Sequence, residues 1–516
     1  MRVSQDSSAP RSPTFSLLGA GVAGIGLAIA QTCPSLWFLT LLAPIPLLAT
    51  ISFEGWCATW LSLAIVSGLQ ALFALEWLRR TAPGYGWILA IAAVVSALSF
   101  LPPSLVFPIV ARRLGRTAAL TLVPVVWAGV EYVGSRHLFG AWWPFLGQPL
   151  AEQPWLCRSA AVLGPEGITY FALALGVFVS ISLRRDRNGG ALARAAALGP
   201  GLAIATSLLG SVDSGQESQP SKTARIALVQ PGLEHVESWT EAERSRFLER
   251  MDHLVDSCTN PPVDLVVLPE SAVPEFVKYD DVSSAWVKAL VQRSGTPLLF
   301  GSLDRNADGS RSYNVAILII PNGEVLTYRK VHLAPVSERI HFPTILGSVL
   351  GGTLSPLLVA ARGGREEFTA GTGVVPFHLP SGMSFGPLIC IEDAYPDLAR
   401  EYASRGADHL IALVNTQRYD GTSLARQHLQ RARLTCIATG LPMVRCTNSG
   451  ISCVISPHGE VLGKLPESAD AGNPVVTAHA FVAASENCKT LYRRFGSWPL
   501  LMTLLGVVAI AVIWRT

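Results

Sequence analysis

Long apolar segments fill the first 211 residues of the chain and return once near its C-terminus. A helix that crosses the hydrocarbon core of a bilayer needs about 20 mainly apolar residues. Eight segments approach this requirement: 14–31, 36–52, 57–78, 86–110, 117–133, 166–184, 195–211 and 496–514. They predict a membrane protein with eight spanning helices, of which the fourth should break or kink at Pro102 and Pro103.

The stretch between the seventh and eighth segments has an ordinary globular composition. We therefore expect four parts: a membrane domain of seven transmembrane helices (1–211), a linker (212–224), a globular domain (225–490) and a C-terminal transmembrane helix (491–516). The whole chain of 516 residues is only 15% charged, whereas a soluble protein carries about a quarter charged residues. This deficit comes from the spans.

Arginines flank the predicted spans unequally. Lys and Arg accumulate in cytoplasmic loops, and an N-terminus in the cytoplasm places ten arginines inside: Arg2, Arg11, Arg112, Arg113, Arg116, Arg184, Arg185, Arg187, Arg194 and Arg515. Only four fall in the outer short loops: Arg79, Arg80, Arg136 and Arg158. Although Arg493 and Arg494 oppose this bias, it predicts seven crossings that leave the globular domain outside the cytoplasm.

Charge and cysteine content exclude several classes of function. The net charge is +3 and no basic cluster is interleaved with aromatic residues, so nucleic acid is not an expected partner. The nine cysteines show neither CxxC spacing nor histidine partners, so the sequence predicts no metal site. No cofactor is expected either.

Short apolar runs alternate with helical patterns in residues 225–490. The runs DLVVLPE, PLLFGSLD, NVAILII and HLIALVN are typical of buried strands, and residues 240–258 of an amphipathic helix. The turn sequences PNGE and PHGE predict hairpins. Together these patterns indicate an α/β domain with packed sheets.

Three polar residues each follow an apolar run in this domain. Glu270 lies in LVVLPESAVP, Lys330 in LTYRKVHLAPVSERI and Cys390 in GPLICIED. A thiol reacts as the thiolate, so Glu270 could take its proton while Lys330 stabilises an oxyanion. Singly, each residue has a simpler interpretation, as a core cysteine, a helix cap or a solvated strand end. Jointly they predict a nucleophilic site.

The order Glu, Lys, Cys within PESA, YRKVHLAPVSE and ICIED resembles the nitrilase, or carbon–nitrogen hydrolase, superfamily. With the membrane spans, the chain is more narrowly similar to the membrane branch of that superfamily, the apolipoprotein N-acyltransferases. The resemblance implies a multi-span α-helical membrane domain plus an α/β nitrilase-like αββα sandwich domain. It also implies a bacterial cytoplasmic (inner) membrane location, with the catalytic domain on the periplasmic face.

The resemblance implies roles for individual residues: Glu270 as general base, Lys330 as oxyanion stabiliser and Cys390 as the acylated nucleophile. It further implies supporting roles at Glu338, Glu392 and Asn415, and substrate binding near the acyl pocket at Trp239. His428 is expected to be structural.

Two positions depart from the family pattern. Ile391 stands where the family usually has an aromatic residue, although its backbone N–H could still serve an oxyanion hole. Residues 416–419 read TQRY in place of the usual Asp-Ala-Trp-Phe, which bears on recognition of the acyl acceptor.

The resulting hypothesis is an acyl transfer in two steps. Cys390 would take an acyl chain from a membrane phospholipid as a thioester, and the α-amino group of the S-diacylglyceryl-cysteine that begins a lipoprotein would then receive it. The insert at 341–372 is expected to lie on the bilayer as a lid, and the enzyme to act as a monomer. The alternatives are a membrane-tethered amidase, in which water attacks the thioester, and a non-catalytic scaffold for lipoprotein handling.

Overall fold

The computed structural model describes residues 13–80, 86–137, 143, 145–183, 223–232, 240–259, 262–273, 276–335, 337–339, 367–465, 475–483 and 489–513. Several predicted features lie outside these residues. They are the span at 195–211, residues 212–222 of the linker, Trp239, and residues 341–366 of the insert.

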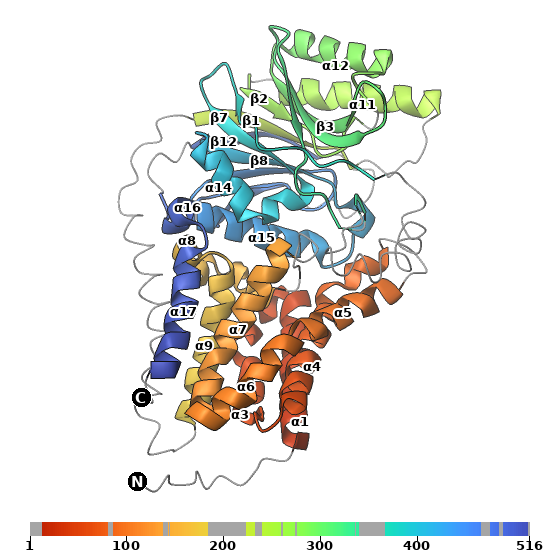
Figure 1. Ribbon diagram of the computed structural model, residues 1–516. Helices are drawn as coiled ribbons and strands as arrows, with labels where there is room; N and C mark the ends of the chain where they lie inside the picture. The colour runs from red at the N-terminus through yellow and green to blue at the C-terminus, as the bar shows by residue number, and fades with distance from the viewer. Residues whose placement is uncertain are drawn as a thin grey trace, which may run out of the picture.

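Apolar helices make up the part of the chain before β1 and its last segment (Figure 1). Their bounds are α1 Pro13–Thr32, α2 Leu39–Leu42, α3 Pro44–Thr50, α4 Trp56–Ala74, α5 Trp87–Ser99, α6 Leu101–Leu114, α7 Arg116–His137, α8 Ala160–Leu163, α9 Glu166–Ser182, α16 Leu491–Phe495 and α17 Trp498–Ile513. Within the described residues, four helical stretches are long and apolar enough to cross a membrane: Thr14–Thr32, Trp56–Ala74, Trp87–Leu114 and Arg116–Arg136. One further pair, Pro154–Leu163 and Glu166–Ser182, passes the same test only when its two helices are taken together, and it is bent by 115°, as in a broken span or a re-entrant loop.

Prolines explain where the helices differ from straight spans. The segment predicted at 36–52 is not one long helix, because α2 ends at Leu42 and α3 begins at Pro44, which has no N–H to continue the ladder. The expected break at Pro102 and Pro103 is present, since both residues lie in the first turn of α6. There their missing N–H groups leave no helical bond unmade.

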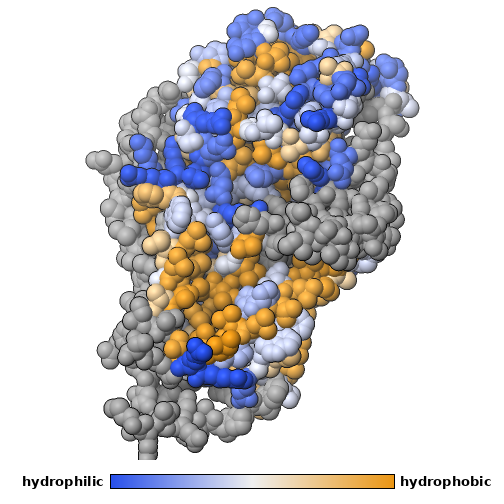
Figure 2. All heavy atoms as spheres, in the orientation of Figure 1, coloured by the Kyte–Doolittle hydropathy of each residue, from blue (hydrophilic) through white to orange (hydrophobic). Residues whose placement is uncertain are grey.

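The outer surface of this helical bundle is apolar. Figure 2 shows a hydrophobic belt over the helices and a mostly hydrophilic surface over the rest of the described chain. Exposed large apolar side chains recur along α1 (Leu18, Val22, Ile25), α6 (Leu105, Val106, Ile109) and α17 (Met502, Leu505). Soluble monomers rarely expose a continuous apolar surface of this extent, and the helices beneath it are apolar enough to cross a membrane, so we take this surface to face lipid.

Two six-stranded sheets form the core of the other half. The strands are β1 Thr223–Gln230, β2 Leu265–Val267, β3 Leu298–Arg305, β4 Ser312–Ile319, β5 Val325–Arg329, β6 Phe377–His378, β7 Ser384–Ile389, β8 His409–Val414, β9 Met443–Thr447, β10 Cys453–Ile455, β11 Val461–Lys464 and β12 Val475–Ala483. The first sheet has the order β12-β1-β2-β3-β4-β5, and the second has the order β11-β10-β9-β8-β7-β6. The turns PNGE and PHGE join antiparallel pairs, β4–β5 and β10–β11, as predicted.

Helices cover the outer faces of both sheets. The helices α11 (Glu241–Cys258) and α12 (Asp281–Ser294) pack on the first sheet through residues such as Phe247 and Leu290. On the second sheet lie α14 (Pro396–Ser404) and α15 (Leu424–Thr439). The predicted αββα sandwich is therefore confirmed.

The helix α15 joins the two halves of the molecule (Figure 1). Ala432 and Cys436 pack toward the second sheet, whereas Leu434, Ile437 and Ala438 belong to the hydrophobic core of the membrane helices. Because this one helix packs against both, the second sheet has a fixed position relative to the lipid-facing bundle.

Candidate active site

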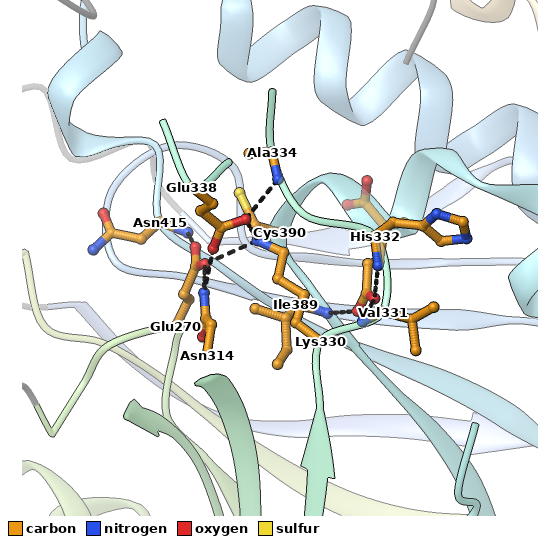
Figure 3. A network of polar contacts seen from close by, with 12 residues as sticks. Glu270, Asn314, Lys330, Val331, His332, Ala334, Glu338, Ile389, Cys390 and Asn415 are labelled. Atoms are coloured by element: carbon orange, nitrogen blue, oxygen red, sulfur yellow. Dashed lines mark hydrogen bonds and ion pairs between the residues drawn. The ribbon is translucent and has the colours of Figure 1, made fainter. Parts of the chain in front are cut away.

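The three residues of the predicted nucleophilic site come close together in space (Figure 3). Glu270 follows β2 and Lys330 directly follows β5, both in the first sheet. Cys390 directly follows β7 in the second sheet. Each side chain is therefore placed by the end of a buried strand.

Glu270 is held on all sides by hydrogen-bond donors. Its Oε1 accepts from Asn314 Nδ2 at 2.8 Å and from Lys330 Nζ at 3.4 Å, and its Oε2 accepts from the backbone N–H of Asn415 at 3.1 Å. The turn that carries it packs tightly, because a Cβ at Gly301 would lie 2.6 Å from Glu270 Cα. A carboxylate in this setting is kept in one orientation.

Lys330 joins two carboxylates. Its Nζ lies 2.9 Å from Glu338 Oε2 as well as 3.4 Å from Glu270 Oε1, and the residue is 1% exposed. Burial alone would lower the pKa of Lys330, but the charges of Glu338 and Glu270 raise it above its usual value. The side chain is therefore an ammonium, and it supplies positive charge to the site.

Asn314 is a residue of the site that the sequence analysis did not predict. Its Nδ2 donates to Glu270 Oε1 at 2.8 Å and to Glu338 Oε1 at 2.7 Å, so it bridges the two carboxylates opposite Lys330. It begins the run NVAILII on β4 and is 4% exposed. The available signal was a single amide side chain in an otherwise apolar strand.

Cys390 has an unusual backbone. Its φ is +52°, in the left-handed region that costs a non-glycine residue about 1–3 kcal/mol. It opens the short 3₁₀ helix η6 (Cys390–Ala394). Burial, together with the negative charge of Glu270, raises the pKa of the thiol well above its usual value. The resting form is the thiol, so a reaction at sulfur needs a neighbouring base. Figure 3 shows that the Cys390 thiol faces the same space as Glu338 and Lys330.

Glu392 connects the strand ends that carry Lys330 and Cys390. Its Oε1 accepts from Tyr328 Oη at 2.8 Å and from the N–H groups of Val331 and His332 at 2.7 and 3.0 Å. Its Oε2 accepts from Ile389 N at 2.8 Å. Burial raises its pKa to about 7. Glu392 therefore holds together the two chain segments that carry Lys330 and Cys390.

Asn415 contributes its backbone to the site. The N–H donates to Glu270, while the side-chain oxygen accepts from Gln417 N at 3.2 Å, and Figure 3 shows the side chain turned away from Cys390. In the segment that departs from the family pattern, Tyr419 makes an edge-on contact with Trp77 at a centroid distance of 5.5 Å. That segment thus packs on the membrane domain.

Comparison with known proteins decides the family. The model of the carbon-nitrogen hydrolase family matches residues 225–482, and the model of the apolipoprotein N-acyltransferase N-terminal domain matches residues 23–178. The apolipoprotein N-acyltransferase of Brucella suis biovar 1 (strain 1330) is 30% identical over 403 residues, which cover 74% of this chain and 72% of that protein. The chain belongs to the apolipoprotein N-acyltransferase family.

The relationship extends over both halves of the chain. The apolipoprotein N-acyltransferase of Geobacter metallireducens (strain ATCC 53774 / DSM 7210 / GS-15) is 26% identical over 522 residues, which cover 97% of this chain and 96% of that protein. Among solved structures, a carbon-nitrogen hydrolase from Helicobacter pylori G27 is 20% identical, with a TM-score of 0.38 over 54% of this chain and 94% of that one. As an apolipoprotein N-acyltransferase family member, the chain is an acyltransferase of the membrane, with a nitrilase-like catalytic domain.

Proposed function

We propose that this enzyme moves an acyl chain from a membrane phospholipid to the α-amino group of the S-diacylglyceryl-cysteine at the N-terminus of a lipoprotein. The observation that carries the proposal is the Lys330-bridged pair of carboxylates beside Cys390, in a chain whose relatives are named apolipoprotein N-acyltransferases. Trp239 remains a proposed contributor to the acyl pocket.

The first step would form a thioester. Glu270 takes the proton of the Cys390 thiol as the sulfur attacks the ester carbonyl of the phospholipid. The negative charge that develops on the carbonyl oxygen is stabilised by the Lys330 ammonium. The ester C–O bond then breaks, and the lysophospholipid leaves with the proton that Glu270 held.

The second step would consume the thioester. The α-amino group of the lipoprotein attacks the same carbonyl, the C–S bond breaks, and Glu270 receives the ammonium proton before returning it to the sulfur. Glu338 and Asn314 keep Lys330 and Glu270 in place in both steps. If water attacked in place of the amine, the thioester would be hydrolysed to a free fatty acid and the Cys390 thiol, which is the hydrolase alternative.

The lipid-facing bundle supports a lipid substrate. Moving an acyl chain from the bilayer into water costs about 0.8 kcal/mol per CH₂, so a site fixed at the membrane surface avoids that cost. We propose that the catalytic domain lies on the outer face of the cytoplasmic membrane. Three arginines support this orientation: Arg112, Arg113 and Arg116. They lie where α6 ends and α7 begins, at the end of the bundle remote from the sheets (Figure 1). Since Lys and Arg accumulate on the cytoplasmic side, the sheets would lie on the opposite side. We further propose that the enzyme works as a monomer.

The test uses cells depleted of lipoprotein N-acylation. Wild type and Cys390→Ala are expressed, and lipoprotein N-termini are read by mass spectrometry. Wild type should add a third acyl chain and the variant should not, whereas Cys57→Ala, which removes an exposed thiol of the membrane domain, should behave as wild type. A purified wild type that releases free fatty acid but never acylates the amine would instead support the hydrolase alternative.

A further inference from the structure

A buried charged cluster lies directly behind Cys390. Asp393 belongs to the same short helix η6, His428 to α15 and Arg445 to β9. His428 Nε2 lies 2.6 Å from Asp393 Oδ1, and Arg445 Nε lies 2.8 Å from Asp393 Oδ2. None of the three is more than 2% exposed. Buried charges are costly to retain, so this cluster requires a physical explanation.

The imidazole of His428 also contacts the nucleophile's own backbone. Its Nε2 lies 3.2 Å from the carbonyl oxygen of Cys390. Both neighbours of Nε2 are acceptors, so this nitrogen must carry the proton and act as the donor. Burial alone would raise the pKa of Asp393, but His428 and Arg445 lower it below its usual value. Asp393 is therefore a carboxylate that orients the imidazole.

Holding this carbonyl fixes the direction of the next N–H. In a planar trans peptide the C=O and the following N–H point in opposite directions. The carbonyl of Cys390 points toward α15, on the outer face of the second sheet, so the N–H of Ile391 points toward the first sheet, which carries Glu270 and Lys330. Ile391 is the second residue of η6, and the helix itself makes no use of its N–H.

We propose that His428, oriented by Asp393 and Arg445, is a positioning residue that aims the Ile391 N–H at the acyl carbonyl. This inference rests on the proposed function, in which Cys390 is the nucleophile. The same contact holds Cys390 in its φ of +52°. Because a backbone N–H does this work, the side chain at 391 can differ from the family's usual aromatic residue without loss of the oxyanion donor.

Two tryptophans of the membrane domain help to keep His428 in position. The Trp143 ring meets the His428 ring edge-on at 5.8 Å between centroids, and Trp143 Nε1 donates to Gln427 Oε1 at 2.7 Å. Trp77 Nε1 donates to that same oxygen at 3.3 Å. Two indoles of the membrane domain thus hold the start of α15, the helix that carries His428.

The test compares two reactions at Cys390 in the purified full-length protein with phospholipid vesicles. Thioester formation passes through an oxyanion, whereas alkylation by iodoacetamide forms a C–S bond, expels iodide and needs no oxyanion donor. In His428→Leu, thioester formation at saturating phospholipid should slow by about tenfold, which is less than the 10²–10³-fold loss that follows removal of an oxyanion donor. Alkylation and the KM for phospholipid should stay near wild type. His428→Gln, which keeps a donor at a similar position, should recover most of the rate.

The outcomes separate the two proposals. Equal losses in both reactions, no loss in thioester formation, or no recovery in His428→Gln would each overturn the positioning role. If His428→Leu does not fold, Asp393→Asn replaces it, because it removes the orienting charge at nearly constant shape and should show the same split. A wild type that forms no thioester at all refutes the proposed function instead.

Discussion

Asn314 offers a quantitative test of how the two carboxylates of the site are held in place. Its Nδ2 donates at 2.8 Å to Glu270 and at 2.7 Å to Glu338. Asn314→Leu removes both bonds at a similar side-chain volume and leaves Lys330 as the cation between two acids. A hydrogen bond to a charged group contributes about 1.5–3 kcal/mol.

The size of the effect follows from two competing magnitudes. The Lys330–Glu270 attraction at 3.4 Å is about 5 kcal/mol at an effective dielectric constant of about 20, which exceeds the lost hydrogen bond. Glu270 should therefore stay beside Lys330 in the variant, but without the Asn314 donor. Since about 1.4 kcal/mol corresponds to a tenfold change in rate, the lost hydrogen bond should slow thioester formation by about ten- to a hundredfold.

The assay is single-turnover thioester formation on Cys390 at saturating phospholipid. The matched control is Asn322→Leu, the same substitution at an exposed turn residue that is not part of the site. A wild-type rate of thioester formation in Asn314→Leu would refute the reasoning.

Three further perturbations test other parts of the structure. Burial raises the pKa of Glu392 from 4.5 to about 7. The free energy of unfolding of wild type should therefore decline as pH rises across that window, by up to about 3 kcal/mol. Unfolding measured against pH in detergent should show a flatter curve for Glu392→Gln. Gly301→Ala places a Cβ 2.6 Å from Glu270 Cα, so the rate of thioester formation should fall and the free energy of unfolding should drop by about 1–3 kcal/mol. A wild-type rate in this variant would contradict the close packing. Arg136 bridges the membrane domain to Asp397 at 2.8 Å, so Arg136→Met should lower the unfolding temperature, and an unchanged temperature would show that this junction adds no stability.

Local sequence determines much of this protein because its main signals are local. A run of apolar residues predicts a membrane-spanning helix from its own length and composition, as at α1 and α7. The end of a strand is likewise marked by its apolar run. The sequence therefore predicted that Glu270, Lys330 and Cys390 would each lie at a strand end. The hairpins at PNGE and PHGE follow from turn chemistry alone.

Only the tertiary structure decided which side chains meet at the site. Asn314 and Glu270 are 44 residues apart and Asp393 and Arg445 are 52 apart, and no local pattern pairs them. Sheet order and the alternation of side chains along each strand bring Asn314 to the carboxylates. The backbone direction at Cys390 likewise depends on His428, which α15 delivers only because that helix is packed between the second sheet and the membrane helices.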